Sequence, residues 1–365
     1  MKINIDKELL LDKLLLSQRF VSNRFSSVSS LQGVLLEVKD KKINIYATNL
    51  TSYFHTIIKN PTDGEKKIVF DPKKVGEFLS LLTPGIIELE ITDREMVVRK
   101  DKTKGTFPFI DAADFPYPPI MKEKEEKIGT SFLKKHLPHV IFAASSDDTR
   151  PVLSGVNFLT QDEEFLMVAT DGFRLSLVKT KKEETVPKML VPKSFLEEVI
   201  RLTKDEKEVG MRHSDKEKVV AFSSGDTTLY SRLIEGDFPP FEKVIPSERK
   251  TKIIVDKEEF LRNTRIVSVF AREVSNIVLL RVNKKGIVLS PKTDTEGQNS
   301  TLQDAEVEGE EQNVAFNFKF VLDFLSHTEG KKVVIEILRP DAPVVFKIDG
   351  DKNFLHVIMP VRIQT

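Results

Sequence analysis

One nine-residue pattern occurs three times along the chain. It reads Asp71-Pro72-Lys73-Lys74-Val75-Gly76-Glu77-Phe78-Leu79, then Val191-Pro192-Lys193-Ser194-Phe195-Leu196-Glu197-Glu198-Val199, then Asn317-Phe318-Lys319-Phe320-Val321-Leu322-Asp323-Phe324-Leu325. Lys73, Lys193 and Lys319 fall in register, 120 and then 126 positions apart. Apolar residues recur at helical spacing, and Pro72 and Pro192 stand where a first-turn proline is tolerated, because its missing N–H would have no helical partner. Each copy therefore predicts a helix.

A second repeated feature precedes each of these helices. The segments 3–10, 128–133 and 253–261 each contain a short extended piece, then Asp or Ser as a helix N-cap, then apolar residues at helical spacing. In the second copy this predicts a helix over 131–145, capped by Ser131.

Between the helices, apolar and polar residues alternate, as in Ile86–Ile91 and 333–338, which predicts strands. Asp114-Phe115-Pro116 and Asp237-Phe238-Pro239 mark matching ends of the first two copies. We therefore expect an α+β fold with three tandem copies of one domain, each with two helices against antiparallel sheets and about eight strands. The expected domains are 1–122, 123–249 and 250–365.

Composition excludes several protein classes. The chain has 365 residues, of which 40% are hydrophobic and 31% charged, as in globular proteins rather than disordered ones. It has no cysteine, so disulfides and thiolate chemistry are excluded. No segment reads as a signal peptide or a membrane span, and we expect a cytoplasmic protein without a membrane partner. Its 56 basic and 56 acidic residues give a net charge of +0, which argues against simple adhesion to DNA.

The alternative is an enzyme, namely a metal-dependent hydrolase that uses Asp171 and a histidine. The six histidines show no metal-binding spacing such as H-E-x-x-H, and the chain has no phosphate-binding glycine loop and no G-x-S-x-G turn. We therefore expect a non-catalytic protein with no cofactor and no metal. By itself, the Ala-Thr-Asp-Gly sequence that contains Asp171 reads as a strand that ends in a turn.

Three motifs nevertheless carry a family resemblance. They are Ala169-Thr170-Asp171-Gly172-Phe173-Arg174-Leu175, Arg232-Leu233-Ile234-Glu235-Gly236-Asp237-Phe238-Pro239, and the C-terminal Val357-Ile358-Met359-Pro360-Val361-Arg362-Ile363. In this order within a threefold repeat, they resemble the β subunit of bacterial DNA polymerase III, the sliding clamps, over essentially the whole chain. The resemblance implies a head-to-tail homodimer whose six domains close a ring around double-stranded DNA, without sequence readout. A neutral protein can then hold DNA by enclosing it, because escape requires a subunit interface to open.

The resemblance also implies a pocket between the second and third domains. It would bind short glutamine- and leucine-containing peptides of DNA polymerases, the clamp loader and repair proteins. Its expected residues are Arg150, Leu153, Thr170, Gly172, Phe173, Arg174, Leu175, Pro239, Lys243, Val244, Val357, Met359, Pro360, Val361 and Arg362.

Two further groups of residues follow from the repeat and the resemblance. The residues expected to face DNA are Arg24, Lys73, Lys74, Lys134, Lys135, Arg150, Lys193 and Lys319. The residues expected at the dimer interface are Phe107, Val269 and Phe270.

The chain departs from the family pattern at three places. Phe173 replaces a common histidine, Pro151 and Val152 replace aromatic residues that often follow the loop arginine, and Val361 replaces a frequent second methionine. The expected location of the pocket is unaffected, while its peptide preference and any stacking on single-stranded template are altered.

Overall fold

The structure is a computed structural model of the chain, and it describes residues 1–22, 29–60, 63–110, 114–147, 149–181, 186–203, 206–272, 275–292 and 299–362. In these ranges no helix has the length and apolar character needed to cross a membrane.

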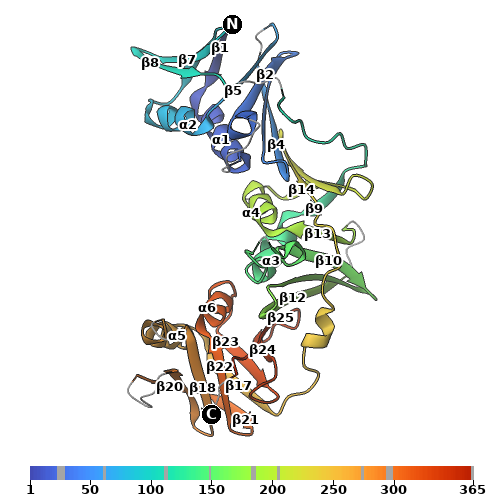
Figure 1. Cartoon of the computed structure of the whole chain (residues 1–365), viewed down its shortest axis with the longest axis vertical. Helices are drawn as coiled ribbons and strands as arrows, with labels where there is room; N and C mark the ends of the chain where they lie inside the picture. The colour runs from blue at the N-terminus through green and yellow to red at the C-terminus, as the bar shows by residue number, and fades with distance from the viewer. Residues whose placement is uncertain are drawn as a thin grey trace. The chain divides into compact units, whose positions relative to one another are not determined.

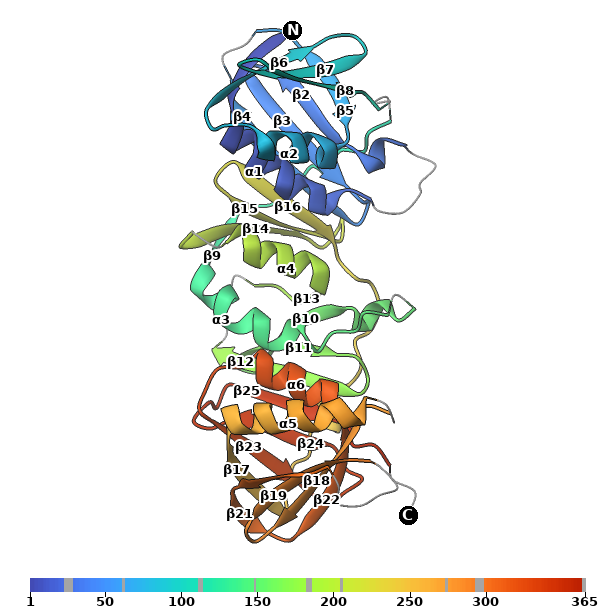
Figure 2. The ribbon, with the colours of Figure 1, turned by 90° about the vertical axis from the view of Figure 1, so that its left-hand side faces the viewer.

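Within the described ranges, each copy of the repeat contributes two α-helices, as predicted. The first helices of the three copies are α1 (Lys7–Ser17), α3 (Thr130–Ile141) and α5 (Lys257–Ala271). The second helices are α2 (Pro72–Leu81), α4 (Lys193–Leu202) and α6 (Phe318–Ser326). In the first and last copies the two helices lie side by side, α1 against α2 and α5 against α6 (Figure 2).

Side-chain caps start four of these helices. The carboxylates of Asp6 and Asp256 accept hydrogen bonds from the N–H groups of Leu9 (2.9 Å) and Glu259 (2.8 Å). Asp71 and Asn317 likewise accept from the N–H groups of Lys73 (2.9 Å) and Lys319 (3.0 Å). Each cap provides a partner for an N–H that the helix itself cannot pair, which stabilises the helix by about 1 kcal/mol.

The second copy differs from the prediction at both helix starts. α3 begins at Thr130 and ends at Ile141, so Ser131 lies inside the helix instead of capping it. Thr130 is held instead by hydrogen bonds of its N–H and hydroxyl to the carbonyl oxygens of Lys207 and Glu206. Pro192 is the last residue of a strand, opposite Gly155, and not part of the first turn of α4. That strand lies at a sheet edge, where a proline is tolerated because the missing N–H breaks no ladder.

The strands follow the repeat as well. The first copy supplies β1 (Lys2–Asp6), β2 (Val34–Lys39), β3 (Lys42–Thr48), β4 (Ser52–Lys59), β5 (Lys66–Phe70), β6 (Ile86–Ile91), β7 (Glu95–Lys100) and β8 (Thr103–Pro108). The second supplies β9 (Glu126–Gly129), β10 (Gly155–Gln161), β11 (Glu164–Thr170), β12 (Arg174–Lys181), β13 (Met189–Pro192), β14 (Glu208–Ser214), β15 (Val219–Ser224) and β16 (Thr227–Arg232). The third supplies β17 (Thr251–Asp256), β18 (Ile277–Asn283), β19 (Gly286–Pro291), β20 (Thr301–Asp304), β21 (Glu306–Gly309), β22 (Gln312–Asn317), β23 (Lys332–Ile337), β24 (Val344–Ile348) and β25 (Phe354–Ile358).

Each copy of the repeat divides its strands between two sheets. The four sheets have the orders β1-β6-β7-β8, β5-β2-β3-β4-β16-β15-β14-β9, β13-β10-β11-β12-β25-β24-β23-β17-β21 and β20-β19-β18-β22. Both junctions between neighbouring copies therefore follow the same pattern: the fourth strand of one copy pairs antiparallel with the last strand of the next. These junctions are β4 with β16 (Figure 2) and β12 with β25 (Figure 1).

Because of these junctions, the compact units of the chain are not the copies of the repeat. One unit, called the N-terminal unit below, contains residues 1–130 and 201–233; the C-terminal unit contains 131–200 and 234–365. The second copy is divided between them, since β9 and β14–β16 extend the sheet of the first copy while β10–β13 extend that of the third. Apolar side chains fill each unit, among them the fully buried Phe54 and Phe70 in the first and Phe324 and Phe346 in the second.

Candidate functional site

A tight turn between β11 and β12 in the C-terminal unit forms the centre of the site. The hydroxyl of Thr170 donates to the carbonyl oxygen of Arg174 (2.6 Å) and accepts from the N–H of Gly172 (3.0 Å). The carboxylate of Asp171 accepts from the N–H groups of Phe173 (2.9 Å) and Arg174 (3.0 Å). Gly172 has a φ of +90°, a left-handed conformation that favours glycine. The Thr-Asp-Gly sequence therefore produces a rigid turn.

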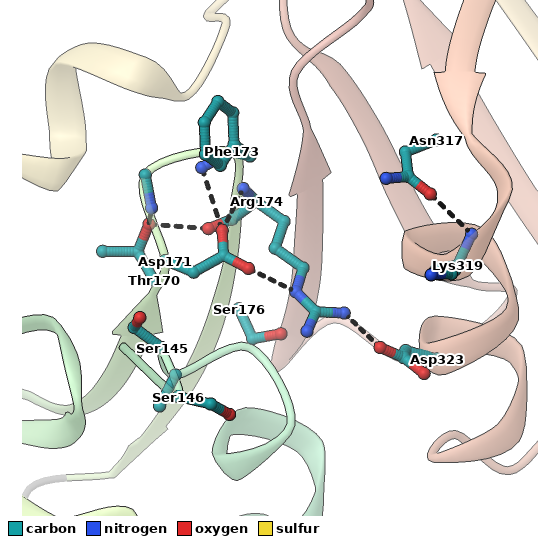
Figure 3. A network of polar contacts seen from close by, with 12 residues as sticks. Ser145, Ser146, Thr170, Asp171, Phe173, Arg174, Ser176, Asn317, Lys319 and Asp323 are labelled. Carbon is teal, nitrogen blue, oxygen red and sulfur yellow. Dashed lines mark hydrogen bonds and ion pairs between the residues drawn. The ribbon is translucent and has the colours of Figure 1, made fainter. Parts of the chain in front are cut away.

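The side chain of Arg174 connects this turn to α6. Its Nε donates to Asp171 (3.0 Å), and its Nη1 pairs with Asp323 of α6 (Figure 3). The guanidinium also lies over the ring of Phe320, 4.7 Å from its centroid, and 5.7 Å from that of Phe142. An arginine held by two carboxylates and an aromatic face has little freedom, so it forms a fixed wall.

Beside Arg174 lies an apolar pocket with a volume of about 150 Å³. Cavities of about this size in engineered proteins hold a benzene-sized group. The pocket is lined by Leu153, Thr170, Gly172, Arg174, Leu175, Pro239, Phe241, Val244, Val357 and Met359. It thus combines the β11–β12 turn, the segment after β16 and the end of β25, all within the C-terminal unit.

Phe241 is the one lining residue that the sequence did not indicate. It begins a short 3-10 helix (Phe241–Val244) and is buried against Leu166, Leu177 and Val357. In sequence, Phe238-Pro239-Pro240-Phe241 reads as a linker, although two aromatic residues around a proline pair were a signal that the segment packs against the sheet.

The other six expected pocket residues are not among the residues that line the pocket. Phe173 and Lys243 are exposed, Phe173 at 61%, and the carbonyl oxygen of Phe173 accepts from the N–H of Met359 (2.8 Å). Arg150 lies close to Gly172: its Nη1 atom is 3.9 Å from the position that a Cβ atom on Gly172 would take. Pro360 and Arg362 continue the chain beyond Met359. The N–H of Val361 donates to the carbonyl oxygen of Ala315 (2.8 Å), which holds the segment that follows Met359 against β22.

A buried polar pair lies on the strands next to the pocket. His356 of β25 is fully buried opposite Ser176 of β12, and their Nδ1 and Oγ atoms are 2.7 Å apart. Burial, and secondarily the charge of Arg174, hold the pKa of His356 well below its ordinary value. The imidazole is therefore neutral at neutral pH.

The residues expected to face DNA are placed as follows. Lys73, Lys193 and Lys319 all lie in the first turn of the second helix of their copy, as the register predicted. Lys73, Lys74 and Lys319 are exposed, and Lys134 and Lys135 lie on α3. The ammonium of Lys193 donates to the carbonyl oxygen of Ala144 (3.1 Å) and to Ser146 (2.6 Å), and burial lowers its pKa. Arg24 lies outside the described residues.

The residues expected at the dimer interface lie at or beside an edge strand in each unit. Phe107 is on β8, the last strand of its sheet, and packs edge-on against Phe78 (5.5 Å between centroids). Val269 and Phe270 are exposed at 59% and 41% on α5, which packs against β20, itself a sheet edge. Ile266 of α5 and Leu302 of β20 are also exposed and were not predicted. Gln303 faces α5 through a hydrogen bond from Asn263, so the adjacent Leu302 points to the opposite face of β20.

Asp171 has a structural role in this arrangement. Its two carboxylate oxygens accept the hydrogen bonds that close the turn and orient Arg174. Among the residues that the structure describes, no three histidine, aspartate or glutamate side chains are grouped to hold a metal ion.

Comparison with known proteins agrees with the fold and the repeat. Family models match three successive parts of the chain: the DNA polymerase III beta subunit N-terminal domain at residues 1–119, its central domain at 127–240 and its C-terminal domain at 242–362. The chain is 27% identical to the beta sliding clamp of Bacillus subtilis over 380 residues, which cover 99% of this chain and 100% of the relative.

Solved structures give the same result. The DNA polymerase III beta subunit of Thermotoga maritima superposes with a TM-score of 0.91 at 25% identity, and the comparison covers 100% of both chains. The beta sliding clamp of C. crescentus, solved with polyethylene glycol bound to its putative beta-motif tethering region, gives a TM-score of 0.90 at 25% identity, again over 100% of both chains. The chain belongs to the DNA polymerase III beta subunit family.

Proposed function

We propose that this protein is a DNA sliding clamp, a ring that encloses double-stranded DNA and keeps a DNA polymerase on its template. The family is non-catalytic, so the protein is a processivity factor and not a metal-dependent hydrolase that uses Asp171. The proposal places it with the replication machinery in the cytoplasm, with domains at 1–122, 123–249 and 250–365.

The way the copies join is the observation that supports a ring most strongly. Inside the chain, the fourth strand of a copy pairs with the last strand of the next, in β4–β16 and β12–β25. By the same rule, β8 is the last strand of the first copy and β20 is the fourth strand of the third copy, and neither has such a partner among the described residues. Each is an edge strand of its sheet in the described part of the chain. A second copy of the chain can therefore pair its β8 with β20, and the reverse pairing closes the ring. This head-to-tail contact would also cover the exposed apolar surface of Val269 and Phe270 on α5.

Enclosure explains how a neutral protein can stay on DNA. Contacts to phosphates weaken steeply as salt rises, whereas an enclosed duplex is released only when an interface opens. The lysines Lys73, Lys74, Lys134, Lys135, Lys193 and Lys319, together with Arg24 and Arg150, would supply weak contacts to the backbone. Such contacts let the ring slide, because they carry no sequence information.

The pocket beside Arg174 would bind partners. An apolar pocket with a fixed arginine wall and a methionine at its opening suits short peptide motifs with leucine side chains, since methionine adapts to different ligands. DNA polymerases are the partners that the sliding-clamp family implies. The clamp loader and repair proteins would compete for the same pocket.

A processivity assay tests this function. With a clamp loader, ATP and a replicative polymerase on a singly primed DNA circle, the wild-type chain should lengthen the product of each binding event at least tenfold. Leu175→Ala combined with Met359→Ala should remove the stimulation and leave the oligomeric state unchanged. The same short products with and without the wild-type chain would contradict the proposal.

The subunit contact has a test of its own. In analytical ultracentrifugation the protein should sediment with the mass of two chains, and Val269→Asp with Phe270→Asp should give the mass of one. Leu15→Asp, at an exposed leucine on α1, is the matched control and should leave the dimer intact. A wild-type mass of three chains would contradict the six-domain ring.

A further inference from the structure

Two more hollows lie in the C-terminal unit, the second next to the pocket and the third next to the second. The second hollow has a volume of about 300 Å³, with Leu166, Leu177, Phe241 and Ile245 among its apolar lining residues and Asp162 and Glu242 among its charged ones. The third has a volume of about 480 Å³ and is lined by Leu177 and Leu355 beside Lys179, Lys347 and Lys352. Phe241 lines both the pocket and the second hollow, and Leu177 lines both the second and the third.

Strand geometry shows that the three hollows form a row on one face of the sheet. Successive side chains of a strand point to opposite faces, so Leu175, Leu177 and Lys179 of β12 share one face. Leu175 lines the pocket, while Leu177 and Lys179 line the second and third hollows. At roughly 3.3 Å per residue, Leu175 and Lys179 are about 13 Å apart. A peptide anchored in the pocket reaches the second hollow with about four extended residues.

Apolar packing makes the floor of this row continuous. Leu166, Leu175, Leu177, Phe241 and Val357 belong to one buried cluster, and Val244 and Ile245 pack against it. A flexible side chain with an apolar stem can therefore lie on this floor beyond Phe241, with its polar end toward the edges of the hollow.

Charge distinguishes the second hollow from the third. The second has three carboxylates, of Asp162, Glu164 and Glu242, and one ammonium, of Lys179, which pairs with Glu164 at 3.5 Å. The third has three lysines with Glu164 and Asp351. An excess of carboxylates above an apolar floor is complementary to a lysine or arginine side chain.

We infer that a partner's peptide continues from the pocket past Phe241 and places a lysine or arginine in the second hollow. This inference rests on the proposed function of the pocket and adds a specificity element outside it. The methylene stem of the basic side chain packs on Leu166 and Leu177, and its charge faces Asp162 and Glu242. Partners with a basic residue about four positions from the apolar motif would then bind more tightly than partners with an acidic residue there.

The test uses fluorescent twelve-residue synthetic peptides that contain one glutamine and two leucines. One series carries lysine, alanine or glutamate four residues before the leucines, and a second series carries them four residues after. Against the wild-type dimer, the lysine peptide of one series should bind about fivefold more tightly than its glutamate counterpart, as expected for two exposed charge contacts. The double variant Asp162→Asn with Glu242→Gln should reduce this ratio to below about twofold, because each change removes a charge at nearly constant shape.

Glu163→Gln is the matched control, since Glu163 is exposed in the same hairpin as Asp162 and does not line the hollows. It should keep the fivefold ratio. A ratio that is the same in the double variant would overturn the inference, because the preference would then come from the overall charge. Equal affinities in both series would also overturn it, provided that the alanine peptides bind and lose affinity with Leu175→Ala and Met359→Ala. If no peptide binds the wild-type protein, the proposed function of the pocket fails instead.

Discussion

The turn at residues 169–175 and its counterpart at 47–53 in the first copy share one backbone design. In the first copy Thr48 donates to the carbonyl oxygen of Ser52 (2.9 Å) and accepts from the N–H of Leu50 (2.9 Å). Asn49 accepts from the N–H groups of Thr51 (3.1 Å) and Ser52 (2.8 Å), as Asp171 does in the second. Leu50, with a φ of 72°, takes the left-handed position of Gly172.

The side chains at three matching positions differ. Leu50, exposed at 46%, stands where Gly172 lines the pocket, and Ser52 stands where Arg174 reaches α6. Next along the strands, the buried pair of Phe54 and Leu229 matches the buried pair of Ser176 and His356. The repeat therefore supplies the turn, and different side chains at these positions give the second copy its glycine at the pocket wall and its arginine link to α6.

The largest difference should come from Arg174 and Ser52. Arg174→Ala leaves Asp171 and Asp323 without their cation, and we expect a loss of about 2 to 3 kcal/mol of stability in the C-terminal unit. Ser52→Ala removes no ion pair and should cost less than about 1 kcal/mol. Amide hydrogen exchange measures both losses: exchange in β12 reports on Arg174→Ala in the C-terminal unit, and exchange in β4 reports on Ser52→Ala in the N-terminal unit. Equal losses at the two positions would show that Arg174 does not stabilise the site.

A smaller difference should follow from exchanging Gly172 and Leu50. Gly172→Leu places a side chain at the pocket wall and should weaken binding of a leucine-containing peptide at least tenfold, about 1.4 kcal/mol. The fold should persist, because the first copy carries leucine in the same turn. Leu50→Gly is the matched control and should leave the affinity unchanged in fluorescence anisotropy. An unaltered affinity for Gly172→Leu would place peptide binding elsewhere.

The smallest expected difference is in the pH dependence of stability, because His356 can take up a proton and its counterpart Leu229 cannot. Because burial depresses the pKa of His356, this side chain stays neutral in the folded protein while the unfolded chain takes up a proton below about pH 6.5. Its contribution to stability is thus complete above that pH and is lost as pH falls, by about 0.7 kcal/mol between pH 7 and pH 6.

The variant His356→Gln should show a fall in stability smaller by this amount, measured as the urea-unfolding free energy at the two pH values. The other histidines are common to both proteins and cancel. The same fall in both proteins would mean that His356 takes up its proton in the folded state as readily as in the unfolded chain.

Much of the fold followed from the sequence because it depends on local signals. Asp6 and Asp256 cap helices as predicted, since a cap acts within three residues. The predicted start of α3 at Ser131 was wrong because Thr130 is held by hydrogen bonds to residues 206 and 207, which are distant in sequence.

The site was predictable to the extent that its residues lie in motifs. Nine of the ten lining residues were in the expected set, and Phe241 was not. The contacts of Arg174 with Phe320 and Asp323 were also missed, because α6 is nearly 150 positions away and only the folded sheet brings it beside the turn. Periodicity cannot reveal such contacts.

The most direct test of the account is retention on DNA. After loading by a clamp loader with ATP, the protein should stay on nicked circular DNA through gel filtration at high salt, and cutting the circle once should release it within minutes. Equal loss from circular and linear DNA would contradict a ring that holds DNA by enclosing it.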